Sequence, residues 1–189
     1  GMLELDFSTI EGTAKASSIW SSHFSAENGF IGPGFTWSSG SGDPAPQSIW
    51  YEFDNVLRVV QYSFQSRTDV GGPLEYEIAL EGPQSYEFWG SNDTDCSKHH
   101  TREVLQAEKP GTPFTRQNNP KVENVDNPAS YRCYGFTVYS TPGIIFDVPG
   151  RQHITISNIR YFYIKEGPGP VFQSFRGSSS FQHPTSQRK

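Results

Sequence analysis

Polar and apolar residues alternate most regularly in residues 47–67, the stretch around which we expect the rest of the chain to fold. Between 49 and 54 the odd positions hold Ile, Tyr and Phe, whereas Glu52 and Asp54 fall on the opposite side. After Asp54 and Asn55 the alternation resumes through residue 64. A period of two that is rich in β-branched and aromatic residues is typical of β-strands. The stretch therefore predicts two strands joined by a very short connection.

The same alternation predicts further strands along the chain. They lie at 74–78, 84–93, 101–107, 131–140 and 153–164, with an edge strand through Leu3, Leu5 and Phe7 and a bend near Ser157-Asn158. Three stretches rich in Gly, Pro, Ser or Asn are predicted to be loops: 17–46, 108–130 and 141–152. No segment shows a convincing helical period, so the pattern predicts an all-β fold.

Composition agrees with one all-β domain, because the 189 residues include 14% aromatic residues, 18 Gly and 14 Pro. A net charge of −5 argues against nucleic acid as a partner, since phosphates require a basic surface. No apolar run approaches the roughly 18 residues of a membrane span. We place the domain at 1–164 and a Gly-, Pro- and Ser-rich tail at 165–189. Within that tail, Phe172, Phe175 and Phe181 are the residues that could dock onto the domain.

The cellular location stays open. The first ten residues lack the basic start and the apolar core of a signal peptide. If Met2 is the native start, we expect a cytoplasmic protein; if the chain is an excised domain, we expect an extracellular one. Cys96 and Cys133 fit either case, as reduced thiols or as a disulfide that contributes roughly 4 kcal/mol. Asn92 begins a glycosylation sequon, which matters only in a secreted protein.

Motifs of catalysis are missing from the sequence, which has no nucleophile elbow, phosphate loop or zinc motif. We therefore expect a protein without catalytic residues. The densest group of metal-ligand residue types is Asp93, Asp95, Cys96, His99 and His100. Neighbouring histidines cannot both face one site from a regular strand, so we interpret this group as a solvated loop.

Aromatic residues in the 17–46 loop have two interpretations. They either plug one end of the core, where each buries roughly 150–250 Å², or form an exposed binding platform. We expect Trp37 to be buried. For Trp20 and Phe30 both interpretations stay open.

Several motifs follow the order found in discoidin, or coagulation factor 5/8 type C, domains. The matching segments are 16–18 (ASS), 37–39 (WSS), 50–54 (WYEFD), 83–93 (ending GSND), 131–139 and 157–163. The chain resembles this family over residues 10–164. The resemblance implies an antiparallel, jelly-roll-like β-sandwich of the galactose-binding-domain-like class.

The resemblance also implies a binding site on loops at one end of the sandwich. These loops correspond to residues 18–24, 28–43 and 65–73. Fucose-binding members of the family use a histidine and two arginines, supported by calcium. Arg67 stands at the first arginine position, but neither Pro73-Leu74 nor Ser38–Gly40 supplies the other two, and Asn28-Gly29 replaces the acidic calcium loop. We therefore expect no cofactor, with calcium as the alternative that the family suggests.

These observations favour a binding module for carbohydrate recognition or adhesion, with a glycan or glycoprotein as partner. The candidate ligand-binding residues are Trp20, His23, Phe30, Arg67 and Asp69. Aromatic faces would stack on a sugar, and the Arg67 guanidinium would donate forked hydrogen bonds either to hydroxyls or to Asp69. The alternative is an intracellular protein–protein interaction module on the same fold, with a protein partner at the same loops or at the tail.

Overall fold

The computed structural model describes residues 1–70, 77, 79–106 and 120–165. The strand predicted at 74–78 and the tail from 166 onward lie outside the described residues, except for Glu77. The strands are β1 (Met2–Glu4), β2 (Gly12–Ala16), β3 (Trp37–Ser38), β4 (Gln47–Gln65), β5 (Ser85–Ser91), β6 (Glu103–Gln106), β7 (Lys121–Asn124), β8 (Ser130–Ser140) and β9 (Thr155–Ile164). The short helices are η1 (Ser22–Phe24), α1 (Asn28–Ile31), η3 (Ala79–Glu81), η4 (His99–Thr101) and α3 (Pro142–Ile145).

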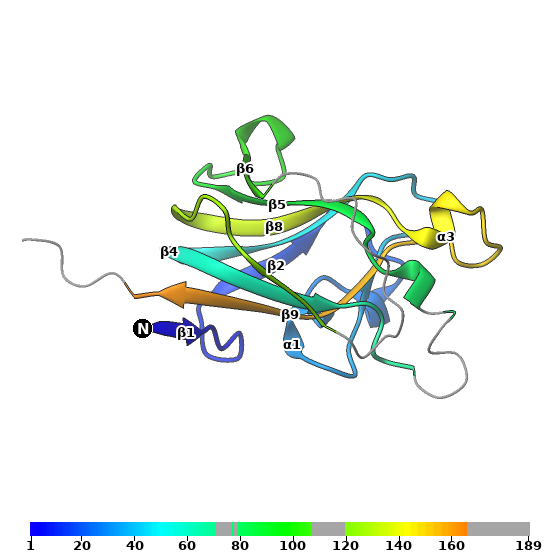
Figure 1. Ribbon diagram of the computed structural model, residues 1–189, viewed down its shortest axis with the longest axis horizontal. Coiled ribbons are helices and arrows are strands. Elements are labelled where there is room, and N and C mark those ends of the chain that lie inside the picture. Colours follow the sequence, from blue (N-terminus) through cyan, green and yellow to red (C-terminus); the bar gives the residue numbers. More distant parts are fainter. Residues whose placement is uncertain (71–76, 78, 107–119, 166–189) are drawn as a thin grey trace, which may run out of the picture.

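Strand β4 organises the fold and belongs to both layers of the sandwich. Its first half pairs antiparallel with β2 and β8, and its second half pairs antiparallel with β9 and β7. The pairing with β8 shifts register between Glu52 and Leu57, and the two halves diverge from this bend in Figure 1. The two predicted strands are therefore one bent strand, because the backbone stays extended through the connection expected at Asp54-Asn55.

The core fills the space between the layer of β2, β4, β8, β5 and β6 and the layer of β1, β9, β4 and β7. Aromatic residues dominate it, including Trp37, Phe53, Tyr62, Phe64, Tyr86, Phe88, Tyr134, Phe136 and Tyr161. The hydroxyls of Tyr62 and Tyr86 are hydrogen-bonded at 3.1 Å. Burial raises the pKa of Tyr86 to about 12 and that of Tyr62 well above its ordinary value, so both hydroxyls stay protonated at neutral pH. The predicted all-β, jelly-roll-like class and the burial of Trp37 are confirmed.

Several predicted elements differ from the structure. Residues 121–124, predicted to be loop, form β7 on the second half of β4. The one-turn helices α1 and α3 were not predicted, since four residues are too few to show a helical period. The bend predicted in β9 is present, with Asn158 in the left-handed region at φ 48°. Among the described residues, no helix is long and apolar enough to cross a membrane.

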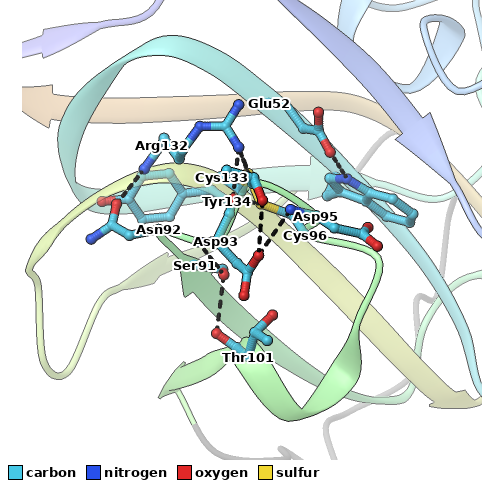
Figure 2. Close-up of a disulfide and its surroundings, with 12 residues drawn as sticks. Glu52, Ser91, Asn92, Asp93, Asp95, Cys96, Thr101, Arg132, Cys133 and Tyr134 are labelled. Carbon is cyan, nitrogen blue, oxygen red and sulfur yellow. Dashed lines mark hydrogen bonds between the residues drawn. A yellow bond between two sulfur atoms is a disulfide. The ribbon is translucent and has the colours of Figure 1, made fainter.

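The two cysteines, whose state the sequence left open, form a disulfide on the outer face of the β8 layer (Figure 2). Cys96 and Cys133 are buried with the rings of Trp50 and Trp89. The Arg102 guanidinium lies 3.9 Å from the Trp89 ring centroid and 5.3 Å from that of Trp50. We call these five residues the disulfide cluster.

All nitrogens of Arg102 donate hydrogen bonds. Its Nε and Nη2 donate to the carbonyl oxygens of Cys96 and Ser97 at 3.0 and 3.2 Å. Its Nη1 donates to the hydroxyls of Ser48 and Thr137 at 3.1 and 3.2 Å. Burial lowers the pKa of Arg102 to about 10, which leaves the side chain charged at neutral pH.

Candidate functional site

Loops from several parts of the chain meet at one end of the sandwich. At this end β2 and β8 finish, β5 and β9 begin, and both ends of the bent strand β4 lie. The amide of Trp20 donates to the Ser38 carbonyl at 2.9 Å, and that of Ser39 donates to the Ile154 carbonyl at 2.9 Å. Across the same end, the Gly34 amide donates to the Thr68 hydroxyl at 3.0 Å. The loops before β3, after β4 and before β9 are thus fixed to one another. We call this the loop end.

Trp20 is the most exposed tryptophan of the loop end. Its backbone is fixed by the bond to Ser38, yet its side chain remains 45% exposed. The ring meets the His153 imidazole edge-on, with 4.5 Å between centroids, and lies 6.1 Å from the Phe24 ring. Trp20 is therefore both positioned by its neighbours and open to solvent.

A hollow of about 700 Å³ opens beside this ring. Its polar lining comes from Asp43, Tyr139, Asp147, Gln152 and His153, together with Trp20. The Gln152 amide donates to the Asp147 carboxylate, and the Tyr139 hydroxyl donates to Glu87 at 2.8 Å. None of the described residues that line the hollow is Lys or Arg. The hollow thus combines an aromatic wall with hydrogen-bonding groups of neutral or negative charge.

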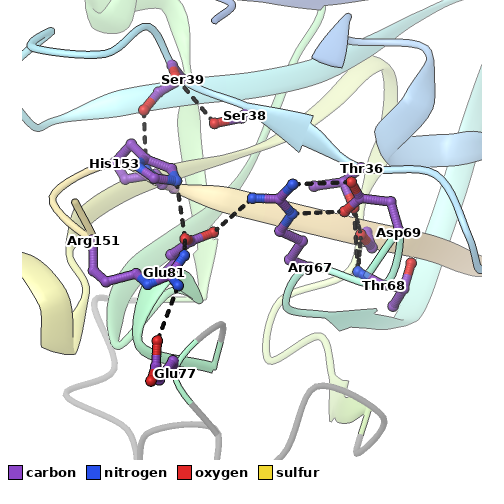
Figure 3. Close-up of polar contacts among 12 residues, drawn as sticks. Thr36, Ser38, Ser39, Arg67, Thr68, Asp69, Glu77, Glu81, Arg151 and His153 are labelled. Carbon is purple, nitrogen blue, oxygen red and sulfur yellow. Dashed lines mark hydrogen bonds and ion pairs between the residues drawn. The ribbon is translucent and has the colours of Figure 1, made fainter. Parts of the chain in front are cut away.

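The carboxylate of Glu81 is fully buried and lies next to His153, one of the residues that line the hollow (Figure 3). Arg151 Nη1 donates to Glu81 Oε1 at 2.7 Å, and His153 Nε2 lies 3.1 Å from the same oxygen. Arg67 Nη1 lies 3.8 Å from Oε2. The hydrogen bond to Glu81 raises the pKa of Arg151 above its ordinary value, with a smaller contribution from a hydrogen bond to Glu77. The carboxylate therefore ties η3 to the loops that carry Arg67 and His153.

Two polar atoms of this group have no hydrogen bond. Within the described residues, Glu81 Oε2 and His153 Nε2 are buried without a hydrogen-bonding partner. The 3.1 Å contact between His153 and Glu81 is an ion-pair distance, but its geometry is not that of a hydrogen bond. Native structures satisfy nearly all such buried groups, so these two buried atoms indicate the position of an ordered water molecule.

Arg67 and Asp69, both predicted ligand residues, are paired with each other. Arg67 donates from Nε and Nη2 to the two Asp69 oxygens at 2.8 and 3.1 Å. Asp69 also accepts from the Thr36 hydroxyl at 2.8 Å, and the guanidinium lies 5.1 Å from the Phe24 ring centroid. These contacts engage Arg67 Nε and Nη2, and the guanidinium lies beside the Phe24 ring.

The remaining predicted residues lie in different environments. His23 is exposed in η1, where its carbonyl accepts from the Asn28 side chain at 2.6 Å. Phe30 is 5% exposed and packs on Phe7 and Tyr51, with ring centroids 4.9 and 5.4 Å apart. The interpretation of Phe30 as an exposed platform is therefore wrong, because α1 turns its ring into the core.

We call Trp20, Phe24, Arg67, Glu81, Arg151 and His153 the loop-end cluster. Sequence reasoning did not identify Phe24, Glu81 or Arg151 as members. His153 was not among the predicted site residues either; it is buried and contacts Trp20. The three partners of Glu81 come from two distant loops, and no spacing in the sequence signals that convergence.

Metal-ligand groups do not gather at the loop end within the described residues. In the part of the chain that the structure describes, the one close group of metal-ligand side chains is Glu52, Cys96 and Cys133. The disulfide leaves neither cysteine with a thiolate. In the loop that leads from β5 to Cys96, the Asp93 and Asp95 carboxylates accept hydrogen bonds from the backbone amides of Asp95 and Ser97, at 3.0 and 3.1 Å. That acidic stretch therefore builds turns of the backbone.

No family model and no curated protein matches the sequence. Solved structures do match. One is the family 32 carbohydrate-binding module of Clostridium perfringens NanJ in complex with galactose, with a TM-score of 0.57, 18% identity, and coverage of 80% of this chain and 93% of that one. Another is chitosan-binding module 1 of a Paenibacillus sp. IK-5 chitosanase/glucanase, with a TM-score of 0.58, 15% identity, and coverage of 80% and 95%.

A third structure is the F5/8 type C domain of a Bacteroides fragilis protein, with a TM-score of 0.61, 10% identity, and coverage of 87% of this chain and 98% of that one. At these identities the likeness shows the fold. The chain has the discoidin-like, galactose-binding-like β-sandwich fold that its motifs predicted. Its structural neighbours include carbohydrate-binding modules.

Proposed function

We propose that the protein is a non-catalytic carbohydrate-binding module and that the hollow beside Trp20 is its binding site. The observation that carries this proposal is the exposed Trp20 ring, fixed by its backbone and by His153 in the wall of a polar hollow. An indole face stacks on the apolar face of a pyranose, while hydrogen-bonding groups around it orient the hydroxyls. The carbohydrate-binding modules among its structural neighbours support the same assignment.

The hollow has the size and the polarity that a small glycan needs. Its volume of about 700 Å³ falls within the range of small-molecule sites, roughly 300–1,000 Å³. Gln152, Asp43 and Asp147 offer acceptors and a donor to sugar hydroxyls. The His153 imidazole belongs to the same wall, and its Nε2 lies 3.1 Å from the buried Glu81 carboxylate.

The charge of the lining sets the expected class of sugar. Asp43 and Asp147 line the hollow and no described lining residue is a cation, so an anionic sugar would face only like charge. Neutral hexoses and sugars with a free amine are the ligands that fit. The Arg67 and Arg151 guanidinium groups stay behind the wall, where Asp69 and Glu81 hold them.

The disulfide bears on the alternative of an intracellular protein-interaction module. A buried disulfide is uncommon in cytosolic proteins and usual in secreted ones. It therefore favours an extracellular setting, where glycans are abundant partners, and supports the carbohydrate-binding proposal over the alternative.

A glycan array followed by calorimetry tests the proposal. We expect binding of neutral or amino sugars, with uronic and sialic acids excluded, and the same affinity with calcium or with a chelator. Trp20→Ala should lower the affinity at least tenfold. Phe35→Ala is the matched control, since Phe35 is an exposed aromatic residue on a neighbouring loop that does not line the hollow. No binding on the array, or equal loss in both variants, would contradict the proposal.

A further inference from the structure

A second and larger cavity, of about 1030 Å³, lies away from the loop-end hollow. Its apolar surface is built from Phe7, Phe30, Tyr51, Ile31 and Ile159. The Phe7 ring lies 4.9 Å from that of Phe30 and 5.0 Å from that of Tyr51, so aromatic surface forms the base. Ile31, 57% exposed, forms part of the outer wall.

This cavity is an open seam between the two layers of the sandwich. Within the described residues β1 pairs only with β9, and β2 pairs only with β4, so each strand leaves one edge without a partner strand. Residues from both strands and from α1 line the seam. Unpaired strand edges beside apolar surface are places where another segment of chain binds.

The rim of the seam carries excess negative charge. Glu4, Asp6 and Glu27 line it, and Arg160 is the one cation among the described lining residues. Arg160 is already held by both oxygens of Glu4, an interaction that lowers the pKa of Glu4. Hydrogen bonds from Ser8 lower the pKa of Asp6. At neutral pH the rim therefore presents carboxylates that a cation beside an apolar group would complement.

We propose that the occupant of this seam is a segment of the same chain, residues 172–176, with Phe175 on the aromatic base and Arg176 at the acidic rim. The sequence there is Phe-Gln-Ser-Phe-Arg, which puts an aromatic side chain directly before a guanidinium. Of the three phenylalanines beyond residue 165, Phe175 alone is followed by a cation, whereas Gln182 follows Phe181 and Gln173 follows Phe172.

The chain is long enough for this contact. The described residues end at Lys165, directly after β9, where Ile164 pairs with Met2. Arg160 is five residues before Lys165, roughly 17 Å back at about 3.3 Å per residue. Residues 166–171 span up to about 20 Å when extended, so the segment from Phe172 can return to the seam.

Disulfide trapping in the full-length protein tests the proposal, with Ile31→Cys in the wall of the seam and Ser174→Cys between the two phenylalanines. Val104→Cys with Ser174→Cys is the matched control, because Val104 is comparably exposed but lies on β6, at the edge of the other layer. In dilute protein and a glutathione buffer, we expect the seam pair to form an intramolecular disulfide at least tenfold faster than the control. The buried native disulfide should survive in both.

Further substitutions in the protein with Ile31→Cys and Ser174→Cys test which side chains of the segment cause the fast disulfide formation. Phe175→Ser, and separately Arg176→Gln, should each slow trapping toward the control rate, whereas Phe181→Ser should leave it unchanged. Equal trapping rates in the seam pair and the control pair would overturn the proposal. Disulfides that join two chains would also overturn it, since they would show that a second copy supplies the segment.

Discussion

Two clusters of arginine and tryptophan occur in this molecule, and they differ in what they leave unbonded. In the disulfide cluster every nitrogen of Arg102 donates a hydrogen bond, and the tryptophans are buried. In the loop-end cluster Trp20 is nearly half exposed, and the buried atoms Glu81 Oε2 and His153 Nε2 have no hydrogen bond within the described residues.

The difference shows how one set of residue types serves two purposes. Where aromatic and guanidinium groups satisfy each other, they join strands and resist change. Where an aromatic ring is fixed but stays open to solvent, as that of Trp20 does, its face is available to a ligand. We therefore expect variants of the disulfide cluster to change stability alone, and variants of the loop-end cluster to change binding as well.

Removal of the disulfide should have a large effect on stability and none on sugar binding. Cys96→Ala with Cys133→Ala reopens a loop with a sequence separation of 37 residues. The chain-entropy model gives roughly 4 kcal/mol for such a loop. Denaturant unfolding of the wild type and the double variant measures the difference. Sugar binding at a temperature where both proteins are folded should be unchanged. A loss of binding at that temperature would show that the disulfide cluster also affects the binding site.

Glu81→Gln should lower stability less than loss of the disulfide, but it should lower sugar binding as well. It removes the buried negative charge that Arg151, His153 and Arg67 surround. Breaking a buried ion pair from one side costs roughly 3–5 kcal/mol, and we expect about 2–3 because both arginines keep some exposure to solvent.

Binding measured by calorimetry should fall in the same Glu81→Gln variant, because the Arg151 and His153 loops lose their common anchor. Glu77→Gln is the matched control, since Glu77 contacts Arg151 from an exposed position at 3.1 Å. Full sugar affinity in a destabilised Glu81→Gln protein would show that the carboxylate serves the fold only.

The strands of the disulfide cluster could be predicted from the sequence, because alternation over seven to eleven residues marks β5 and β8 clearly. The disulfide could not, since one pair of cysteines fits two compartments. β7 was missed because four residues between polar loops give too little pattern, and its partner residues on β4 are about 60 positions earlier.

The loop-end cluster was predicted only in outline. The family resemblance pointed to the loops near Trp20 and Arg67, and the structure does bring those loops together. The exposure of Trp20 and the burial of Phe30 depend on how one loop of irregular structure packs, which periodicity does not encode. Glu81 and Arg151 are 70 residues apart, and only the fold makes them neighbours.

Arg102→Lys should lower the unfolding free energy by less than the variants above, and it tests what stacking on Trp89 contributes. A lysine keeps the charge but loses the planar fork that stacks on Trp89 and bonds two carbonyls and two hydroxyls. We expect a loss of about 1–2 kcal/mol in unfolding free energy and unchanged sugar affinity. Arg132→Lys is a comparison on β8, where the side chain donates to the Asp93 carbonyl at 2.7 Å but lies over no ring in the described contacts. Equal losses in the two variants would show that stacking adds nothing.

Trp20→Ala should have the smallest effect on stability, and together with Trp89→Ala it should distinguish the two clusters most clearly. Its ring is exposed on one side and touches mainly His153 and Phe24, so we expect an unfolding free energy within about 1 kcal/mol of the wild type. Trp89→Ala removes a ring of the same type that is 1% exposed, which should cost about 3–5 kcal/mol. If sugar affinity falls at least tenfold in Trp20→Ala and persists in folded Trp89→Ala, the two tryptophans divide binding from stability. Comparable stability losses in the two variants would instead place Trp20 in the core, because an open binding platform cannot contribute as much to folding as a buried ring.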